Sequence, residues 1–207
     1  MSDAASYFIP ARETEITTEI KRSRFIAQIA HCPGPEQAKV IIEQAQKKYP
    51  DARHHCWAYI ACPPRSATAV RCFDAGEPSG TAGKPILNVL QHSHYGEIIC
   101  VVSRYFGGIK LGAGGLIRAY SNSTQIAIEQ LKVKEIVKLT SLQIQFPYCY
   151  ESSIRHFLEL QKISLRTADY QEKVIFDLEL EHSEVHNTIM QLQNICKGQV
   201  EVLEHKS

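Results

Sequence analysis

The segment EIICVVSRYFGGIKLGAGGLIRAY (97–120) decides how the first two-thirds of this chain fold. Residues 97–105 are largely apolar at consecutive positions, which predicts a strand covered on both faces. Beyond the glycines, apolar residues recur at helical spacing from Leu116 to Leu131, with polar residues between them. The segment therefore predicts a buried strand, a glycine-rich turn and an amphipathic helix, which together belong to an α/β layer.

Glycines are concentrated in this part of the chain, because nine of the 11 lie between residues 76 and 115. A Walker loop ending at Gly83-Lys84 is excluded by Pro78 and Pro85, and a dinucleotide fingerprint starting at Gly112 is excluded by Ile117. Two interpretations of GGIKLGAGG (107–115) stay open. Backbone N–H groups at a helix N-terminus bind an anion there, or the glycines only allow tight turns and close packing of helix on sheet.

The pattern of the sequence changes near residue 137, which predicts two domains, 1–137 and 138–207. In the first domain we expect strands at 23–31, 55–62, 69–73 and 97–105, and helices at 35–49 and after residue 115. In the second we expect strand, helix, two hairpin strands, helix and strand at 141–148, 151–162, 163–170, 173–182, 183–196 and 199–205. This β-α-β-β-α-β order is the ferredoxin-like pattern, so the predicted fold class is α+β.

Basic side chains gather around the glycine-rich turns. Arg104 ends the buried strand, Lys110 lies between glycines and Arg118 lies in the first turns of the next helix, so we expect these three cations at one rim. For each residue, the alternative is an ordinary surface ion pair. Asp74 and Glu77 are acidic site candidates. The predicted anion site consists of Arg24, Arg53, His54, Lys84, Arg104, Gly107, Gly108, Lys110, Gly112, Gly114, Gly115 and Arg118.

Composition restricts the classes of function. A formal net charge of +1 argues against a protein that coats nucleic acid with its whole surface, although it permits a local basic patch. No segment is typical of a secretory signal or a membrane span, and seven cysteines without a CxxC pair indicate reduced thiols in a cytoplasmic protein. Strand alternation sends His54 and His55 to opposite faces, so we expect no metal site. No cofactor and no catalytic residue are predicted.

Four segments carry a family resemblance: KRSRFIA (21–27), DARHHCWAY (51–59), FDAGEPSGTAGKPIL (73–87) and VVSRYFGGIKLGAGGLIRAY (101–120). In this order and spacing they closely resemble the IMPACT/YigZ family, and the resemblance covers essentially the whole chain. It departs from the family pattern at Ala75, where a second aspartate is common, and at Ala113, where threonine is usual. A metal role for two adjacent aspartates is therefore weakened.

The resemblance implies an N-terminal domain like domain 2 of ribosomal protein S5 and a C-terminal domain like the last domain of the translocation elongation factor. It also implies translation regulation, because eukaryotic relatives compete for the activator of a kinase that phosphorylates an initiation factor. Those relatives use an additional N-terminal domain that is absent from this sequence, so their partner does not transfer directly.

The residues and the resemblance together predict two alternative functions of different class. The first is a non-enzymatic module that binds RNA, the ribosome or a translation-associated protein through a basic N-domain recess and the C-domain sheet. The second is a small-molecule phosphate-binding enzyme with a topology like that of GHMP kinases, although the kinase pattern PxxxGLGSSA is not reproduced in this chain.

Overall fold

The computed structural model describes residues 6–64, 69–137 and 139–206. They form two compact units, a larger one from Tyr7 to Ile136 and a smaller one that comprises Ser6 and the residues from Val137 onward. In the described residues up to Val137, the strands are β1 (Ser6–Pro10), β2 (Thr14–Ile20), β3 (Ser23–His31), β4 (His54–Ile60), β5 (Val70–Phe73), β6 (Ile98–Tyr105) and β7 (Val133–Val137). The helices are α1 (Pro35–Lys48), α2 (Gly83–Ser93) and α3 (Ala113–Glu129).

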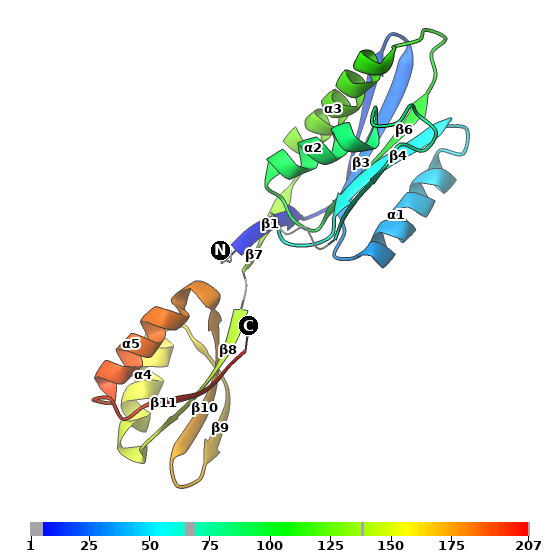
Figure 1. Cartoon of the computed structure of the whole chain (residues 1–207). Coiled ribbons are helices and arrows are strands. Elements are labelled where there is room, and N and C mark those ends of the chain that lie inside the picture. The colour runs from blue at the N-terminus through cyan, green and yellow to red at the C-terminus, as the bar shows by residue number, and fades with distance from the viewer. Residues whose placement is uncertain (1–5, 65–68, 138, 207) are drawn as a thin grey trace. The chain divides into compact units, whose positions relative to one another are not determined.

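The larger unit is built on a five-stranded sheet of order β2-β3-β6-β4-β5, in which neighbouring strands are antiparallel. Helices α2 and α3 cover one face and α1 covers the other (Figure 1). The central strand β6 contributes Cys100 and Val102 to the core under α2 and α3, and Ile99 and Val101 to the core under α1. Burial on both faces therefore explains the run of consecutive apolar residues in this strand.

The sequence did not predict β1, β2, α2 or β7, and of these β2 and α2 belong to the main sheet and its helical layer. Strand β2 (TEITTEI) lies at a sheet edge, and its alternate residues Ile16 and Ile20 pack against the core under α3. Helix α2 begins inside the first glycine-rich stretch, so Gly83, Lys84 and Pro85 are its first turn and not part of a loop. A proline is compatible with the first turn of a helix, where the N–H groups have no intrahelical acceptor.

The smaller unit has the expected order of strand, helix, two strands, helix and strand. Its four-stranded antiparallel sheet has the order β11-β8-β10-β9, and α4 and α5 lie on the same face (Figure 1). Alternate residues Leu142, Ile144 and Phe146 of β8 point toward these helices and are buried. The elements are β8 (Leu139–Phe146), α4 (Glu151–Gln161), β9 (Ser164–Tyr170), β10 (Val174–Glu181), α5 (Val185–Ile195) and β11 (Glu201–Lys206), with short 3₁₀ turns at Tyr148–Tyr150 and His182–Glu184.

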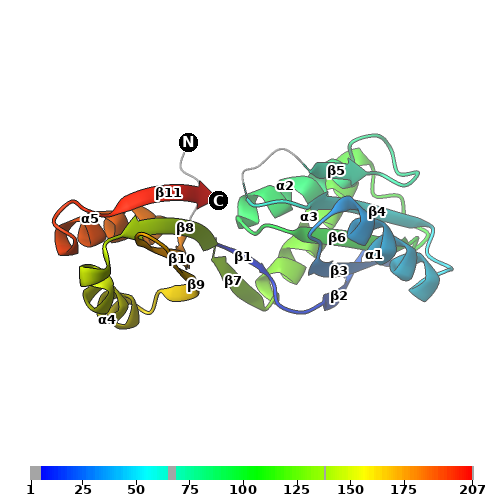
Figure 2. The same ribbon diagram turned by 90° about the horizontal axis from the view of Figure 1, so that it is seen from below.

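Strands β1 and β7 pair with each other in a separate two-stranded sheet (Figure 2). Their ladder continues into a hydrogen bond in which the Ala11 N–H donates to the Lys132 carbonyl oxygen. Within the described part of the chain, no helix is long and apolar enough to cross a membrane.

Candidate functional site

A pocket of about 340 Å³ opens where β6 ends and α3 begins. We call it the glycine-loop pocket, because loop 106–112 forms one of its walls. The start of β4 and the loop between β5 and α2 form the others. Six residues predicted from the sequence line this pocket: Arg53, His54, Glu77, Arg104, Lys110 and Gly112.

Arg104 is part of a buried polar network and does not lie on an exposed rim. Its Nη1 donates to Glu77 Oε1 at 2.6 Å, and only 7% and 4% of the two side chains are exposed. The Tyr120 hydroxyl donates to the same carboxylate oxygen at 2.8 Å, while Arg104 Nη2 lies 3.5 Å from Ser23 Oγ. Glu77 therefore neutralises Arg104, and the pair serves the fold because separating it would leave one buried charge without a partner.

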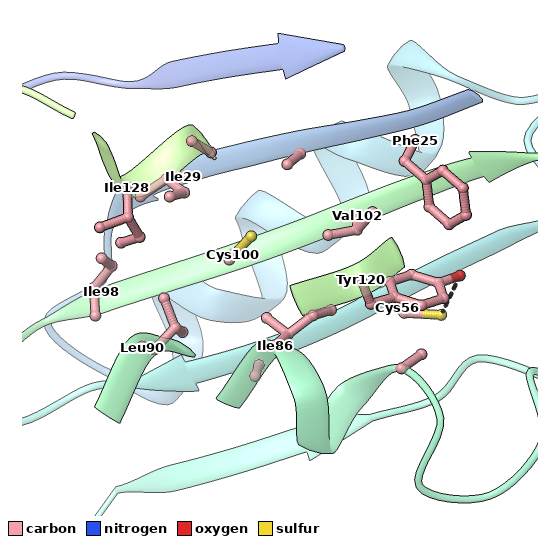
Figure 3. Packing of buried hydrophobic residues seen from close by; sticks show 14 of the residues in the cluster. Phe25, Ile29, Cys56, Ile86, Leu90, Ile98, Cys100, Val102, Tyr120 and Ile128 are labelled. Atoms are coloured by element: carbon pink, nitrogen blue, oxygen red, sulfur yellow. Dashed lines mark hydrogen bonds between the residues drawn. The ribbon is translucent and has the colours of Figure 1, made fainter. Parts of the chain in front are cut away.

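The network continues to Cys56, whose Sγ lies 3.3 Å from the Tyr120 hydroxyl (Figure 3). The same sulfur lies 2.9 Å from the Asp74 carbonyl oxygen. The Phe25 ring meets the Tyr120 ring edge-on, with centroids 5.3 Å apart. Burial raises the pKa of the Cys56 thiol to about 12 and raises that of Tyr120 well above its ordinary value. Both groups are therefore protonated at neutral pH and are not activated nucleophiles.

The carboxylate of Asp74, which was predicted as an acidic site residue, accepts hydrogen bonds from backbone N–H groups. Its Oδ1 accepts from the N–H groups of Ala82 and Gly83 at 3.0 and 2.8 Å, and its Oδ2 accepts from the Gly80 N–H at 2.8 Å. Partial burial by itself raises the pKa of this carboxyl, but the three N–H donors outweigh that effect and lower it below the ordinary value. The carboxylate thus satisfies the start of α2, whose preceding residue provides no side-chain cap.

Unlike the N-terminus of α2, the N-terminus of α3 has no side-chain hydrogen-bond acceptor among the described residues. Gly112 precedes the helix with φ = +72°, and no side chain caps the helix there. The first N–H groups of a helix have no intrahelical acceptor, and Gly112 and Ala113 both line the pocket. The Arg53 and Lys110 side chains reach the same pocket and form no ion pair with any other described residue. This arrangement suits a phosphate or carboxylate, since helix N–H groups and cations both favour an anion.

Eight of the 14 predicted residues are not among those that line this pocket, and Arg24, Lys84, Gly107 and Gly108 are four of them. Arg24 is within β3 on the opposite face of the sheet from Arg104, where its guanidinium stacks over the Tyr105 ring at 4.2 Å. Lys84 is in the first turn of α2, near Asp74. Gly107 serves packing, because a Cβ there would lie 2.0 Å from the backbone of Arg22. Gly108 has φ = +83° with open space around it, so the backbone turn is what requires glycine.

Arg118 and Gly115 line a second hollow of about 690 Å³, which runs along α3 and which we call the α3 groove. The expected single rim of Arg104, Lys110 and Arg118 is therefore divided among a buried ion pair, the glycine-loop pocket and the α3 groove. Leu111 lines both hollows, so they adjoin. Gly114 lies in the first turn of α3, where the closest approach of a Cβ would be 3.8 Å from Arg118 Nη1.

Sequence reasoning missed two polar groups that organise this region, Ser23 and the Tyr120 hydroxyl. Ser23 is fully buried, and its Oγ accepts from the Gly107 N–H at 3.1 Å. Tyr120 appeared in the sequence as one of the apolar positions of a helix. Its polar role was predictable in principle, because the hydroxyl of a tyrosine on the buried face of a helix requires a hydrogen-bond partner.

The two histidines at the start of β4 have separate hydrogen-bond partners, in agreement with the alternation of side chains along a strand. His54 Nδ1 lies 2.9 Å from the Ala75 carbonyl oxygen, which can only accept, so Nδ1 carries the proton. His55 Nδ1 lies 2.9 Å from Ser103 Oγ, and burial lowers its pKa. Across the ranges that the structure describes, no three His, Cys, Asp or Glu side chains converge to hold a metal ion.

Comparisons with known proteins identify the relatives of this chain. Residues 21–128 match the Impact N-terminal domain. The IMPACT family member YigZ of Escherichia coli (strain K12) is 38% identical over 198 residues, which cover 96% of this chain and 97% of that protein. The family member YvyE of Bacillus subtilis (strain 168) is 32% identical over 199 residues, which cover 96% and 91%. A crystal structure described as that of a hypothetical protein superposes with a TM-score of 0.67 at 38% identity, covering 96% of this chain and 97% of the other.

Proposed function

The chain belongs to the IMPACT family, and from this premise we propose that it is a non-enzymatic, translation-linked protein that contacts RNA through the glycine-loop pocket. One observation carries the proposal: the uncapped N-terminus of α3 shares a pocket with Arg53 and Lys110, two cations without an ion pair among the described residues. Helix N–H groups and basic side chains are typical partners of nucleic-acid phosphates. The link to translation, including the ribosome or a translation-associated protein as the wider partner, follows the regulatory role implied by the family resemblance.

The proposal is confined to the larger unit. The face of the smaller sheet that points away from α4 and α5 carries Asp177 and Glu179, of which the first accepts from Ser141 and the second pairs with Arg166. This face has no excess of cations among the described side chains. Polyanion binding requires such an excess, so the C-terminal sheet is not included in the RNA contact.

We assign the two domains as 1–137, similar to domain 2 of ribosomal protein S5, and 138–207, a ferredoxin-like domain similar to the last domain of the elongation factor. The order of elements in the smaller unit supports the second assignment, because β-α-β-β-α-β is the split βαβ arrangement. The pairing of β8 with both β10 and β11 also agrees with it, since β8 is then central in the sheet.

The second candidate is an enzyme that binds a small phosphorylated substrate. It is favoured by the concavity of the glycine-loop pocket, because about 340 Å³ is within the usual range for small-ligand sites. The buried thiol and phenol beside the pocket supply no nucleophile, so such an enzyme would need Glu77 or His54 as its acid or base.

The test is binding of a labelled single-stranded RNA to the wild-type protein and to the variant Arg53→Gln/Lys110→Gln across a salt series. Each phosphate contact on a single strand contributes about 0.7 to the slope of log affinity against log salt, so losing two contacts lowers the slope by about 1.4. Arg104 is left unchanged because its replacement would unpair Glu77. Affinity and slope equal to those of the wild type would overturn the proposal.

A matched control is Lys39→Gln/Lys47→Gln, which removes the same charge from exposed positions of α1, on the other face of the sheet. This variant should keep the wild-type affinity and slope. The enzyme alternative is tested in parallel by thermal melting with mononucleotides. Specific stabilisation by a mononucleotide, without binding of RNA, would favour the enzyme.

A further inference from the structure

The turn between β2 and β3 holds two cations in an unfavourable backbone conformation. Lys21 has φ = +47° and Arg22 has φ = +63°, and neither is glycine, asparagine or aspartate. Two-residue hairpin turns with both φ values positive strongly prefer Asn-Gly, because side chains with a Cβ are strained there. Neither side chain forms a hydrogen bond or ion pair with another described residue. Because no side-chain contact among the described residues offsets this strain, it points to a role of the two side chains outside the fold.

This turn is held against the loop that forms the glycine-loop pocket. The absence of a side chain at Gly107 allows its backbone to lie directly on Arg22 and Ser23, with the Gly107 N–H donating to Ser23 Oγ. Lys21, in the same turn, lines the α3 groove together with Arg118 of the helix. The Arg118 guanidinium reaches back toward Gly114 at the start of α3, so it lies close to the boundary between the two hollows.

The lining of the α3 groove matches one kind of ligand. Lys21 and Arg118 are its charged residues, and no carboxylate is among its lining side chains. Ile20, Leu111 and Ile117 supply apolar contact surface, and the Asn122 amide makes no hydrogen bond to any other described group. Cations, apolar walls and a free amide correspond to the phosphate, base face and base edge of a nucleotide.

We propose that the α3 groove is a second nucleotide subsite, which takes the residue adjacent to the phosphate held in the glycine-loop pocket. The ligand is a single-stranded nucleic acid that crosses Leu111 from one hollow to the other. This inference rests on the proposed role of the glycine-loop pocket. A single strand is required because a concave groove accepts an unstacked base, whereas duplex RNA is recognised by shape across its minor groove. The strained turn presents Lys21, and beside it Arg22, to the backbone of this strand.

The first test is a length series of oligouridylates and oligothymidylates, from one nucleotide to eight, with Lys21→Gln/Arg118→Gln as the groove variant. We expect wild-type affinity to rise when the second subsite is filled. The groove variant should lose this rise and keep the affinity for the shortest ligand, whereas Arg53→Gln/Lys110→Gln should lose both. An unchanged rise in the groove variant would overturn the second subsite and leave the proposed function standing. No effect in either variant would overturn both.

The oligothymidylate series distinguishes DNA from RNA as the ligand. A rise in affinity with length for RNA alone would assign contacts to the 2′-hydroxyl. A duplex RNA of the same length and a polyglutamate peptide serve as competitors. Weak competition by both is expected. Competition by either as strong as that of the single strand would exclude the proposed ligand class.

The second test uses Lys21→Asn/Arg22→Gly, which introduces the dipeptide preferred in this turn. We expect a higher melting temperature, because the strain is relieved, together with a salt slope lowered by about 1.4 if both cations contact phosphates. A purely structural turn would gain stability without any loss of binding, and that result would contradict the inference. Because this variant favours the native turn, reduced binding in it is not attributable to misfolding.

Discussion

Asp74 illustrates, at the scale of one residue, how an apparent site carboxylate can be structural. Its folded pKa is lowered, so the stability it contributes is present above the ordinary aspartate pKa of about 3.9 and is lost as the pH falls through the folded pKa. We expect Asp74→Asn to lower the free energy of unfolding at neutral pH by about 1–2 kcal/mol, as for loss of a helix cap. The amide retains one oxygen acceptor but turns an NH₂ group toward an N–H that now has no acceptor.

Urea unfolding of both proteins between neutral and acidic pH measures this effect. The wild-type free energy should fall more steeply below about pH 4 than that of Asp74→Asn, so the two curves converge in acid. Asp51→Asn is the control, because Asp51 is exposed and makes no hydrogen bond to another described residue. Parallel curves for wild type and Asp74→Asn would show that the carboxylate does not support α2.

The sequence predicted which residues gather near the glycine turns better than it predicted their partners. Arg53, Lys110 and Gly112, which lie at strand ends and turns, share a pocket. Arg104 is also a basic residue at a strand end, yet it forms a buried ion pair with Glu77. That pairing depends on how the loop after β5 folds back over the end of β6, which is a tertiary contact and leaves no local pattern in the sequence.

The β2–β3 turn and the loop that begins at Gly107 make the strongest prediction at the scale of elements. In Gly107→Ala the new Cβ would lie 2.0 Å from the carbonyl group of Arg22, so the turn and the loop must separate. Gly112→Ala has open space but φ = +72°, and strain there costs about 1–2 kcal/mol. Gly34→Ala, with open space and an extended φ of −164°, is the matched control.

Unfolding free energies should therefore decrease in the order Gly34→Ala, Gly112→Ala, Gly107→Ala, with the last losing more than strain alone explains. Chemical denaturation with circular dichroism gives the ranking. If Gly107→Ala were as stable as Gly112→Ala, the close contact between the turn and the loop would be wrong, and with it the placement of Lys21 in the α3 groove.

Elements with a long and uniform pattern were predictable, and those with mixed signals were not. Strand β6 is a run of consecutive apolar residues, and helix α3 has a clear helical period. Helix α2 starts within a run of glycine and proline that reads as a loop, and Asp74, nine residues before Gly83 in the chain, supplies the missing cap. Strand β2 alternates clearly, but a seven-residue edge strand of Thr, Glu and Ile buries only one face.

At the scale of the whole molecule, the two units have separate hydrophobic cores. Among the residues that the structure describes, the core of the smaller unit is formed by those between Leu142 and Val200, without a contribution from the larger unit. The change of sequence pattern near residue 137 precedes the first residue of this core, Leu142. The pocket and the groove were not predictable in the same way, since they are assembled from β2, β4, β6, α2, α3 and several loops.

We predict that a fragment comprising residues 138–207 folds alone and unfolds cooperatively. Its sheet is completed by its own four strands, and Phe146 and Phe176 pack edge-on within its core with centroids 4.9 Å apart. A domain of this size buries only about 60% of its unfolded surface, so its melting temperature should be modest. Thermal melting followed by near-ultraviolet and far-ultraviolet circular dichroism should give coincident transitions. Residues 1–137, expressed separately, should retain the salt-dependent RNA affinity of the full chain, because both hollows lie in the larger unit. A gradual, non-coincident transition in the smaller fragment would mean that its core requires the larger unit, and the boundary at residue 137 would then be wrong.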